Sequence, residues 1–519
     1  MSLVPAFTAD ALLDLLQPLN VLCGLVAYFS WQIIYAMYLS PLRHIPGSLW
    51  FRISGFPMLL YQLRGLEPTL MKQFNQTYGG IFVMGPSRVA ICDPKDSQTI
   101  LSSHAFLKDR MYSNVELMEP NMFLTVDPEL NKQRRRQMGP SMSLANLKLM
   151  EPAILEAGPK QLFNKWDWNI EQSTDGITAR VLYHNDLMLM AFDIISTLGF
   201  GQTHRSLTSG DTKITKWVHS TFILIFFQSV MPLVKTTLFR RFIAKSFYNE
   251  FDAFFALCTK AVSERKKLLS GLQPNENKPK DILQSYIDAE DPESRIRMTT
   301  GQVVTETIIG LLAGSDTSSN TMTWTIHLLL MYPQYQARVV EEVRTAFGRD
   351  HIINYSEAKA SLPLLEACIY ESLRLNPVAT NMPRLIPPGG ATFQGHFIPG
   401  GYNLTISISA VNTNPAVWEK PYEFYPERFL DNEVNKRAVL TFSAGVRVCP
   451  GKNLAWMEMQ STLANIFNKY NLMIPADSLF KPDLVDDNGN PILMPRTVAT
   501  TTVPQHPERD CIVLVAKRA

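Results

Sequence analysis

The chain has 519 residues, and its 49 Lys and Arg nearly balance its 47 Asp and Glu, which leaves a formal net charge of +2 at pH 7. This balance excludes the strong basic field by which a protein binds nucleic acid. Hydrophobic residues make up 46% of the chain, as expected for a globular body with a modest membrane part. The six cysteines are scattered without a CxxC pair, so we expect a reducing compartment and no structural disulfides.

An N-terminal stretch is apolar enough to cross a membrane. Residues 15–42 contain no charged residue, and residues 21–39 are largely apolar or aromatic apart from one serine and one glutamine. About 20 such residues form a helix that spans a bilayer. A cleaved signal peptide is the alternative, but the run is long, no basic residue precedes it and no clear small-residue cleavage site follows it. We therefore expect a retained membrane anchor.

The charges that flank this stretch predict its orientation. Asp10 and Asp14 precede the apolar run, whereas Arg43 and Arg52 follow it. Basic residues are enriched on the cytoplasmic side of a membrane helix. The body of the protein is therefore expected to face the cytosol.

Further segments have recognisable patterns. Residues 80–91 contain a Gly-Pro-Ser turn between apolar runs and predict a β-hairpin. Residues 222–234 form a second apolar run, which is too short to span a membrane and predicts a core or interfacial segment. Residues 300–332 predict a long helix that ends at a proline. Residues 390–410 predict short strands, and residues 412–428 an irregular segment rich in proline and aromatic residues.

Two charged motifs allow more than one interpretation. The basic stretch Lys-Gln-Arg-Arg-Arg at 132–136 suits a solvated helix face or a patch against a membrane surface. Glu371 and Arg374 lie three residues apart on a short predicted helix, 364–375, and most such pairs are surface ion pairs worth roughly 0.2–0.5 kcal/mol. Their apolar neighbours indicate burial instead, and a buried pair needs further partners to offset its desolvation.

The centre of the predicted 300–332 helix has the sequence Ala-Gly-Ser-Asp-Thr-Ser, at 313–318. This composition is unusual for a buried helix, because glycine weakens a helix and Asp, Thr and Ser compete for backbone hydrogen bonds. One interpretation is a kinked core helix whose polar side chains satisfy themselves. The other is a local opening in which an acid–alcohol pair, Asp316 and Thr317, supplies protons to a reacting group.

The loop at 442–451, Phe-Ser-Ala-Gly-Val-Arg-Val-Cys-Pro-Gly, places one cysteine between glycines that let the chain fold tightly. A helical pattern follows at once, so Cys449 precedes a helix N-terminus, where free N–H groups and the helix dipole favour a thiolate. A lone cysteine is otherwise most simply a buried, inert thiol. A thiolate with Arg447 two residues away instead suits an iron ligand beside an anionic cofactor edge.

Four sequence motifs resemble those of the cytochrome P450 family and follow one another in the family's order, with the cysteine loop last. The cysteine loop matches the haem-loop pattern Phe-x-x-Gly-x-Arg-x-Cys-x-Gly at every position. The helix centre matches Ala-Gly-x-Asp-Thr, and Glu-x-x-Arg and Pro-Glu-Arg-Phe lie between these two motifs. The resemblance implies a mainly α-helical P450 fold with small β-sheets, preceded by a single N-terminal transmembrane helix. It divides the chain into a membrane anchor at 1–42 and a catalytic domain at 43–519.

The resemblance also implies haem b as the cofactor, with Cys449 as the proximal iron ligand. In the family, one helix reaches a haem propionate through an Arg that follows a Trp or His by four residues. Here that position is Arg135, but Asn131 replaces the Trp or His, so Arg134 or Arg136 could serve instead. The implied cofactor-binding residues are Arg135, Arg384, Phe442, Gly445, Arg447, Cys449, Gly451 and Ala313.

Other residues receive roles from the same resemblance. Asp316 and Thr317 would deliver protons to bound O2, and Glu371, Arg374 and Arg428 would form a structural clamp behind the cysteine loop. Large apolar side chains with few charges would line the substrate pocket, which favours a lipophilic, steroid- or terpenoid-like substrate. The predicted pocket residues are Met111, Tyr112, Phe123, Phe222, Phe226, Leu311, Val378, Thr380 and Met382.

The chain therefore resembles a membrane-anchored haem-thiolate monooxygenase, in the style of the microsomal enzymes of fungal secondary metabolism. Since we find no GxGxxG or P-loop motif, electrons from NADPH would arrive through a separate NADPH–cytochrome P450 reductase, with cytochrome b5 as a further partner. The endoplasmic reticulum membrane is the expected location. The alternatives are a related isomerase or dehydratase that needs no reductase, a haem-binding sensor without turnover, and a membrane-tethered scaffold without haem.

Overall fold

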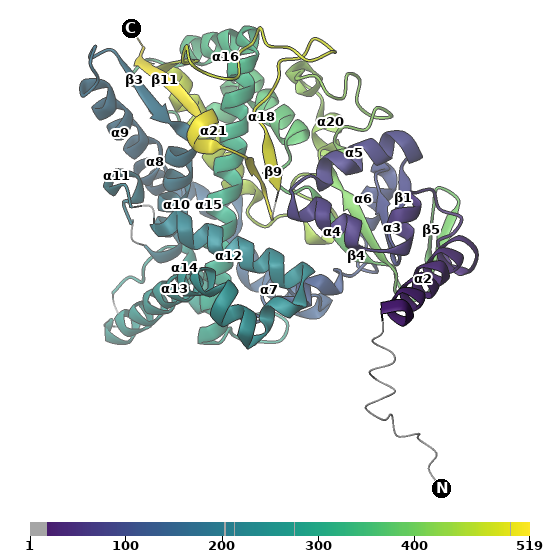
Figure 1. The fold of residues 1–519 in the computed structure, drawn as a ribbon. Coiled ribbons are helices and arrows are strands. Elements are labelled where there is room, and N and C mark those ends of the chain that lie inside the picture. The colour runs from purple at the N-terminus through teal and green to yellow at the C-terminus, as the bar shows by residue number, and fades with distance from the viewer. Residues whose placement is uncertain (1–17, 202–203, 212, 274–275, 499, 519) are drawn as a thin grey trace.

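The computed structural model describes residues 18–201, 204–211, 213–273, 276–498 and 500–518. It is mainly helical, and a long helix, α15 (Thr300–Met331), runs through the centre of the body (Figure 1). A capping box starts α15, because the Thr299 side chain accepts the N–H of Gln302 and the Gln302 side chain accepts the N–H of Thr299. Pro333 opens the next helix, so the predicted long helix and its end are confirmed.

The other helices pack around α15 and beside the sheets. The helices before it are α2 (Pro18–Ile34), α3 (Leu49–Ile53), α4 (Phe56–Leu63), α5 (Glu67–Tyr78), α6 (Pro94–Ser102), α7 (Pro128–Met138), α8 (Leu144–Ala157), α9 (Pro159–Glu171), α10 (Tyr183–Phe200), α11 (Ser206–Ser209), α12 (Lys213–Val230), α13 (Lys245–Gly271) and α14 (Ile282–Asp288). Those after it are α16 (Pro333–Ala346), α17 (Tyr355–Ser361), α18 (Pro363–Leu375), α19 (Ile408–Val411), α20 (Glu433–Ala438), α21 (Lys452–Lys469) and α22 (Pro507–Asp510). Since α15 contacts α10, α13, α18 and α21, most of its side chains are buried.

The strands of the described residues form small sheets. The largest has the strand order β1 (Ile81–Gly85), β2 (Arg88–Ile91), β7 (Asn403–Ser407), β4 (Asn381–Leu385). Its first two strands are the predicted hairpin, with Ile81 opposite Ile91; β7 runs parallel to β2, and β4 antiparallel to β7. The other sheets pair β11 (Ile512–Lys517) with β3 (Thr178–Leu182) and β8 (Tyr470–Met473), β9 (Arg496–Val498) with β10 (Thr502–Pro504), and β5 (Ala391–Phe393) with β6 (His396–Ile398).

The described part of the anchor is helical. Helix α2 continues into a short π-helix, η1 (Tyr35–Leu39), and residues Pro18–Leu39 are long and apolar enough to cross a membrane by length and composition. Only 6% of the most hydrophobic window of this segment is buried. In Figure 1, α2 lies at the edge of the molecule, next to α3. Asp10 and Asp14 lie outside the described residues.

Arg52 braces the turn that follows the anchor. Its guanidinium donates to the Leu42 carbonyl at 3.0 Å, to the Gly47 carbonyl at 3.3 Å and to the carbonyl of Ile45. These bonds fix the direction in which the chain leaves the apolar segment. Arg43 and Arg52 are the two basic residues that follow the apolar run. Arg52 therefore has a structural role in addition to its contribution to the predicted orientation.

The second apolar run lies at the end of α12 and in the short 3-10 helix η4 (Pro232–Lys235). Leu224 and Ile225 are buried in the body, whereas Leu233 is 76% exposed. The run therefore has both a core part and a surface part, as expected of an apolar segment too short to span a membrane.

Candidate functional site

The cysteine loop is a tight turn against α6. The Cys449 N–H donates to the Phe442 carbonyl at 2.9 Å, which closes the loop on itself. Gly445 has a φ of +60°, and a Cβ at this position would lie 2.7 Å from the carbonyl oxygen of Leu101 in α6. Glycine alone combines this backbone angle with this approach. The loop thus holds Cys449 just ahead of α21.

Cys449 differs from the other cysteines of the body. Four of those are buried, whereas Cys449 is partly exposed. Burial raises the pKa of the Cys449 thiol, while the Gly451 N–H and the cations of Arg135 and Lys452 lower it. A metal ion that binds the sulfur replaces the thiol proton, and the same N–H group and cations then stabilise the thiolate.

Four cations converge beside this loop: Lys108, Arg135, Arg384 and Arg447, here named the cation cluster. Burial, and then repulsion by the three arginines, lowers the pKa of Lys108 well below its usual value. Burial, and then repulsion by Arg384 and Arg135, lowers the pKa of Arg447 to about 10. Within the described residues, no carboxylate forms an ion pair with any of the four.

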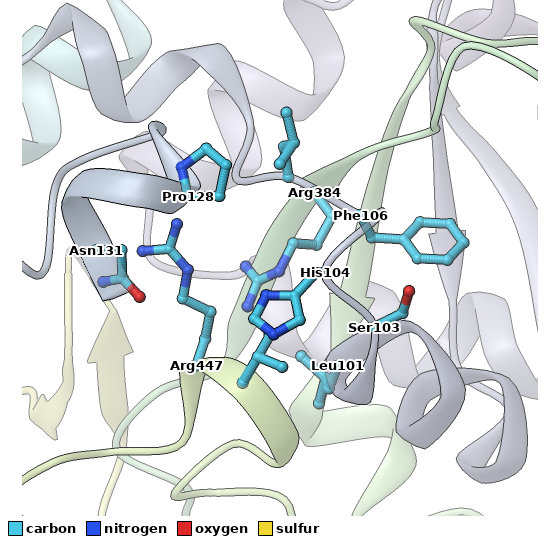
Figure 2. A pocket seen from close by; sticks show the side chains of 10 residues that line it. Leu101, Ser103, His104, Phe106, Pro128, Asn131, Arg384 and Arg447 are labelled. Carbon is cyan, nitrogen blue, oxygen red and sulfur yellow. The ribbon is translucent and has the colours of Figure 1, made fainter. Parts of the chain in front are cut away.

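The cation cluster needs an anion. Arg384 donates to the carbonyl of its neighbour Pro383 at 2.8 Å, and Arg447 donates to the Thr125 carbonyl at 3.4 Å, so both bond only neutral oxygens. Figure 2 shows both guanidinium groups among the side chains that line one pocket. Buried like charges are costly unless an opposite charge is present. The two propionates of a haem would supply that charge next to a sulfur ligand for its iron, so these residues fit a haem.

Arg135 is the residue of the basic stretch that faces the cysteine loop. Its Nη2 donates to the Val448 carbonyl at 2.7 Å, and its Nε donates to Oδ1 of Asn131 at 3.3 Å. The Asn131 amide in turn donates to the Met122 carbonyl at 2.9 Å. Asn131 stands where the family has Trp or His, and here it orients Arg135 by a hydrogen bond.

The two neighbouring arginines are used elsewhere. Arg134 lies 3.4 Å from Glu306 of α15, and both side chains are only 1% exposed. Arg136 donates to the Asp291 carboxylate at 2.6 and 3.0 Å. Of the three arginines, only Arg135 belongs to the cation cluster. The geometry therefore favours Arg135 as the one that would meet a haem propionate.

The centre of α15 presents one exposed residue on a largely buried stretch of helix. Ala313 is exposed, whereas most side chains in the turns around it are buried. The Thr317 hydroxyl donates to the Ala313 carbonyl at 2.7 Å, and the Ser315 hydroxyl donates to the Leu311 carbonyl at 2.8 Å. The helix is continuous through this region, and both hydroxyls are satisfied by backbone carbonyls of the preceding turn. The opening at this point consists of free surface beside Ala313, where a cofactor or substrate can approach the helix.

Asp316 is buried next to Thr317 with an incompletely bonded carboxyl. It is 5% exposed, and its Oδ2 has no hydrogen-bond partner among the residues that the structure describes. Burial raises the pKa of Asp316 to about 6, and the side chains of Thr501 and Asn320 limit that rise. A carboxyl with a pKa near the pH of its surroundings can both hold and release a proton.

Glu371, Arg374 and Arg428 lie together in the core, each with a side chain at most 5% exposed. Arg374 donates to Glu371 twice, at 2.7 Å each, and Arg428 donates to it at 3.2 Å. Glu371 also accepts the N–H of Tyr425 at 2.9 Å. This ion pair therefore has the further partners that burial requires.

These three residues tie α18 to the chain that precedes the cysteine loop. Arg374 donates to the carbonyl oxygens of Asn412 at 3.0 Å and Pro421 at 2.6 Å. The Asn412 amide donates to Thr441 Oγ1 at 3.2 Å, and Thr441 directly precedes Phe442. Glu371, Arg374 and Arg428 thus help to hold the start of the cysteine loop in place through the backbone of residues 412–428, which suits a structural role.

The predicted pocket residues come from several parts of the chain. Met111 and Tyr112 lie on the short 3-10 helix η2 (Arg110–Asn114), Phe123 in the loop after it, Phe222 and Phe226 on α12, Val378 and Thr380 between α18 and β4, and Met382 on β4. The β9–β10 hairpin brings two of these parts together, since Thr500 donates to the Phe222 carbonyl and Thr502 to the Val378 carbonyl. The rings of Tyr112 and Phe123 lie with their centroids 4.2 and 4.5 Å from the Lys108 Nζ, so they border the cation cluster.

Leu311 does not fit the predicted pocket. It is 1% exposed, and its Cδ2 lies 3.7 Å from where a Cβ on Gly199 of α10 would stand. Successive residues of an α-helix turn by about 100°. Leu311 therefore points roughly opposite to Ala313, two residues later, and this part of the prediction is corrected: Leu311 is a core residue between α10 and α15.

Two parts of the site have no clear signal in the sequence. Lys108 belongs to a Lys-Asp-Arg run that suggests a solvated loop, and only the fold shows that it is 6% exposed beside three arginines. The tip of the β9–β10 hairpin carries Thr500, Thr501 and Thr502, a run of β-branched residues. Such residues indicate a strand, but nothing local to them indicates which distant elements they touch.

Comparisons with known proteins show the family. The Cytochrome P450 family profile matches residues 52–495, so the chain belongs to the cytochrome P450 family, which binds haem. The chain is 38% identical to cytochrome P450 monooxygenase helB1 of Aspergillus fumigatus, over 97% of this chain and 87% of that protein. It is 37% identical to helB3 of the same fungus, over 94% of this chain and 96% of that protein. The protein is thus an oxidoreductase, a cytochrome P450 monooxygenase.

Solved structures share the fold. The heme domain of cytochrome P450DA superposes with a TM-score of 0.73 at 21% identity, over 89% of this chain and 95% of that one. Another cytochrome P450 gives a TM-score of 0.71 at 19% identity, over 87% and 94%. At such identities the likeness shows the fold alone. It confirms the predicted fold class, a mainly α-helical P450 fold with small sheets.

Proposed function

We propose that this P450 monooxygenase hydroxylates a lipophilic small molecule, steroid- or terpenoid-like, in fungal-type secondary metabolism. One oxygen atom of O2 enters the product as a hydroxyl, and the other leaves as water after it receives two electrons and two protons. NADPH supplies the electrons through a separate NADPH–cytochrome P450 reductase, and cytochrome b5 is a further donor. The observation that carries the proposal is the cation cluster beside Cys449, which suits a haem and its thiolate ligand.

In this proposal, haem b is held by the Cys449 sulfur and by the cation cluster. When bound, the haem supplies the oxygen chemistry, and the protein supplies orientation, electrostatics and control of water. Gly445 and Gly451 shape the loop below it, and Phe442 starts that loop. Ala313 leaves room for the cofactor and O2 on the α15 side.

Asp316 and Thr317 are proposed to move protons toward O2. Burial raises the pKa of Asp316 to about 6, so its carboxyl can take up and release a proton near neutral pH. Thr317 is the next residue, and a hydroxyl both donates and accepts hydrogen bonds. Its hydroxyl bonds the Ala313 carbonyl, which keeps it at the exposed part of α15. The two side chains can therefore pass a proton from a buried carboxyl to the space beside Ala313.

The substrate class is proposed from the walls of the pocket. Phe222, Phe226, Val378 and Met382 present apolar surface, which binds a substrate by burying its own apolar surface. Thr380 adds a hydroxyl to this lining. An apolar wall with few polar groups favours a fused-ring hydrocarbon skeleton over a charged or sugar-like molecule.

The membrane anchor supports a location in the endoplasmic reticulum membrane, with the catalytic domain in the cytosol. The exposed apolar segment Pro18–Leu39 is the feature that supports a single span. A cytosolic body would meet a membrane-bound reductase on the same side. A lipid bilayer would also concentrate the lipophilic substrate near the protein.

A spectral titration tests the substrate class. The full-length protein in detergent is titrated with a panel of steroids, terpenes and fatty acids, and the Soret band is followed for the shift that accompanies displacement of water from the iron. We expect saturable shifts with fused-ring steroids or terpenes, and hydroxylated product only when reductase, NADPH and O2 are all present. Shifts with fatty acids alone would contradict the substrate class, and product formed without reductase and NADPH would contradict the reaction.

A further inference from the structure

A single turn, residues 121–125, supplies the oxygen atoms that two members of the cation cluster bond directly. Lys108 Nζ donates to the Phe123 carbonyl, and Arg447 Nη1 donates to the Thr125 carbonyl at 3.4 Å. Backbone carbonyls accept hydrogen bonds but carry no net charge, so these bonds orient the two cations without neutralising them. The direction in which the cations point therefore depends on where the turn lies.

Arg135, a third member of the cluster, meets the same turn through Asn131. The Asn131 amide donates to the Met122 carbonyl at 2.9 Å, and its Oδ1 accepts a hydrogen bond from Arg135 Nε at 3.3 Å. Arg135 Nη2 in turn donates to the carbonyl of Val448 at 2.7 Å, next to Cys449. Three of the four cations are thus oriented by one short stretch of backbone.

The turn is held by Asn121 from within and by Glu306 of α15. Asn121 is fully buried, and its Oδ1 accepts the N–H groups of Phe123 at 3.1 Å and Leu124 at 2.8 Å. The Met122 N–H donates instead to Glu306 Oε1 at 2.9 Å. The Glu306 side chain is 1% exposed, so this bond is shielded from water. Loss of the acceptor would leave a shielded N–H without a partner, which is costly.

Glu306 also forms an ion pair, which alone would have only a structural meaning. Arg134 Nε of α7 lies 3.4 Å from the same Oε1, and both side chains are 1% exposed. Such a pair joins α7 to α15 whatever the turn does. The bond to the Met122 N–H is what carries the position of Glu306 to the carbonyl groups that orient the cations.

We propose that Glu306 is a positioning residue for the haem-binding cations, which it sets through the Met122 N–H. The turn transmits the position of α15 to Lys108, Arg135 and Arg447, and so to the propionates that these cations would bind. This inference rests on the proposed function, because it requires a haem at the cation cluster. Glu306 acts through the turn and is not itself a catalytic residue.

Two double variants isolate the bond to the Met122 N–H. In the leucine variant, Arg134→Met with Glu306→Leu removes both buried charges and the acceptor. In the glutamine variant, Arg134→Met with Glu306→Gln removes the same charges but keeps an oxygen that can accept the N–H. Replacing both members of a buried ion pair is often neutral for stability, so we expect both proteins to fold.

Resonance Raman spectra of the full-length protein in detergent report the bending mode of the haem propionates, whose frequency follows their hydrogen bonding. This mode should shift in the leucine variant and keep its wild-type frequency in the glutamine variant. Transfer of haem to apomyoglobin should be about fivefold faster in the leucine variant than in the glutamine variant, the effect of one ordinary hydrogen bond. Amide hydrogen exchange of residues 121–125 should differ between the two variants in the same direction.

Glu342→Leu is the matched control, because it also removes a carboxylate that accepts backbone N–H groups. Glu342 accepts those of Leu364 at 2.8 Å and Leu365 at 3.0 Å, at the start of α18. This variant should keep the wild-type propionate mode and transfer haem within about twofold of the wild-type rate. Asn131→Leu, which breaks the next link without changing a charge, should shift the propionate mode as the leucine variant does.

Three outcomes would overturn the inference while the proposed function stands. The first is a wild-type propionate mode and equal haem transfer in the two double variants, even if faster exchange shows that the turn has loosened. The second is an equal change in Glu342→Leu, because a general loss of stability would then explain the result. The third is an unchanged mode in Asn131→Leu. A wild-type protein without the red-shifted Soret band of a thiolate-ligated haem, in its reduced carbon monoxide spectrum, would contradict the proposed function and the inference with it.

Discussion

Glu371→Gln is the substitution that most severely tests how the cysteine loop is supported. It removes one negative charge and changes the shape of the side chain little. In the folded protein, Glu371 is fully buried and accepts hydrogen bonds from Arg374, Arg428 and the Tyr425 N–H. The substitution therefore leaves two buried guanidinium groups without their carboxylate.

The expected cost follows from that arrangement. Breaking a buried ion pair by removing one partner costs about 3–5 kcal/mol, and because glutamine keeps part of the hydrogen bonding we expect about 3 kcal/mol here. That is a large share of the roughly 5–15 kcal/mol that stabilises a typical domain. Since Arg374 also bonds the backbone that leads to Thr441, we expect the cysteine loop and its haem to be lost at lower urea than the bulk of the helices.

The assay is urea unfolding of the full-length protein in detergent, followed by Soret absorbance and far-UV circular dichroism. Glu156→Gln is the matched control, because Glu156 pairs with Lys160 at 2.7 Å on the surface, where the side chains are 61% and 46% exposed. This exposed pair should contribute less than about 1 kcal/mol. If the free energy of unfolding of Glu371→Gln lies within about 1 kcal/mol of the wild-type value, as expected for an exposed pair, the structural role assigned to Glu371 is refuted.

Other substitutions test the remaining parts of the site. Thr317→Ala should fold normally and raise the peroxide formed per NADPH several-fold, because a proton donor is lost; Thr321→Ala, one turn further along α15, should not, and an unchanged ratio in Thr317→Ala would exclude its role. Because folded Asp316 keeps its proton up to about pH 6 while unfolded Asp loses its proton near about pH 4, its contribution to stability should fall as the pH rises through this window and stay constant above it. Urea midpoints of the wild type and Asp316→Asn should therefore change relative to each other only between these pH values, and a constant difference throughout would contradict the raised pKa. Gly445→Ala should lower the free energy of unfolding by more than about 2 kcal/mol and reduce haem content. Gly139 has open space around it, so the free energy of unfolding of Gly139→Ala should stay within about 1 kcal/mol of the wild-type value. Equal losses of stability in the two variants would contradict the tight packing of the loop.

Local patterns predicted much of this structure. The hairpin at 80–91, the helix that stops before Pro333 and the cysteine ahead of α21 each follow from turn residues, a helix stop or periodicity within a short stretch. The grouping of Glu371 and Arg374 with Arg428 came from a resemblance, because the contact between Glu371 and Arg428 spans 57 residues and has no local signal.

The rest depended on tertiary contacts. The sequence alone does not distinguish Arg135 from its two neighbours. In the structure, Arg134 pairs with Glu306 and Arg136 pairs with Asp291, which leaves Arg135 for the cation cluster. Lys108 is buried by elements that are remote in the chain, and nothing in its own stretch of sequence indicates that burial. Leu311 was misplaced for a different reason, because two positions along a helix reverse the direction of a side chain and only the packing of α15 against α10 shows which face is which.

The reduced carbon monoxide spectrum of the full-length protein tests sulfur ligation most directly. The wild type and Cys23→Ser, in which the exposed cysteine of α2 is replaced, should both show the red-shifted Soret band of a thiolate-ligated haem. Cys449→Ser should lose this band while its far-UV circular dichroism stays that of a folded protein. Persistence of the band in Cys449→Ser would contradict the account, because the sulfur bound to iron would then have to come from another residue.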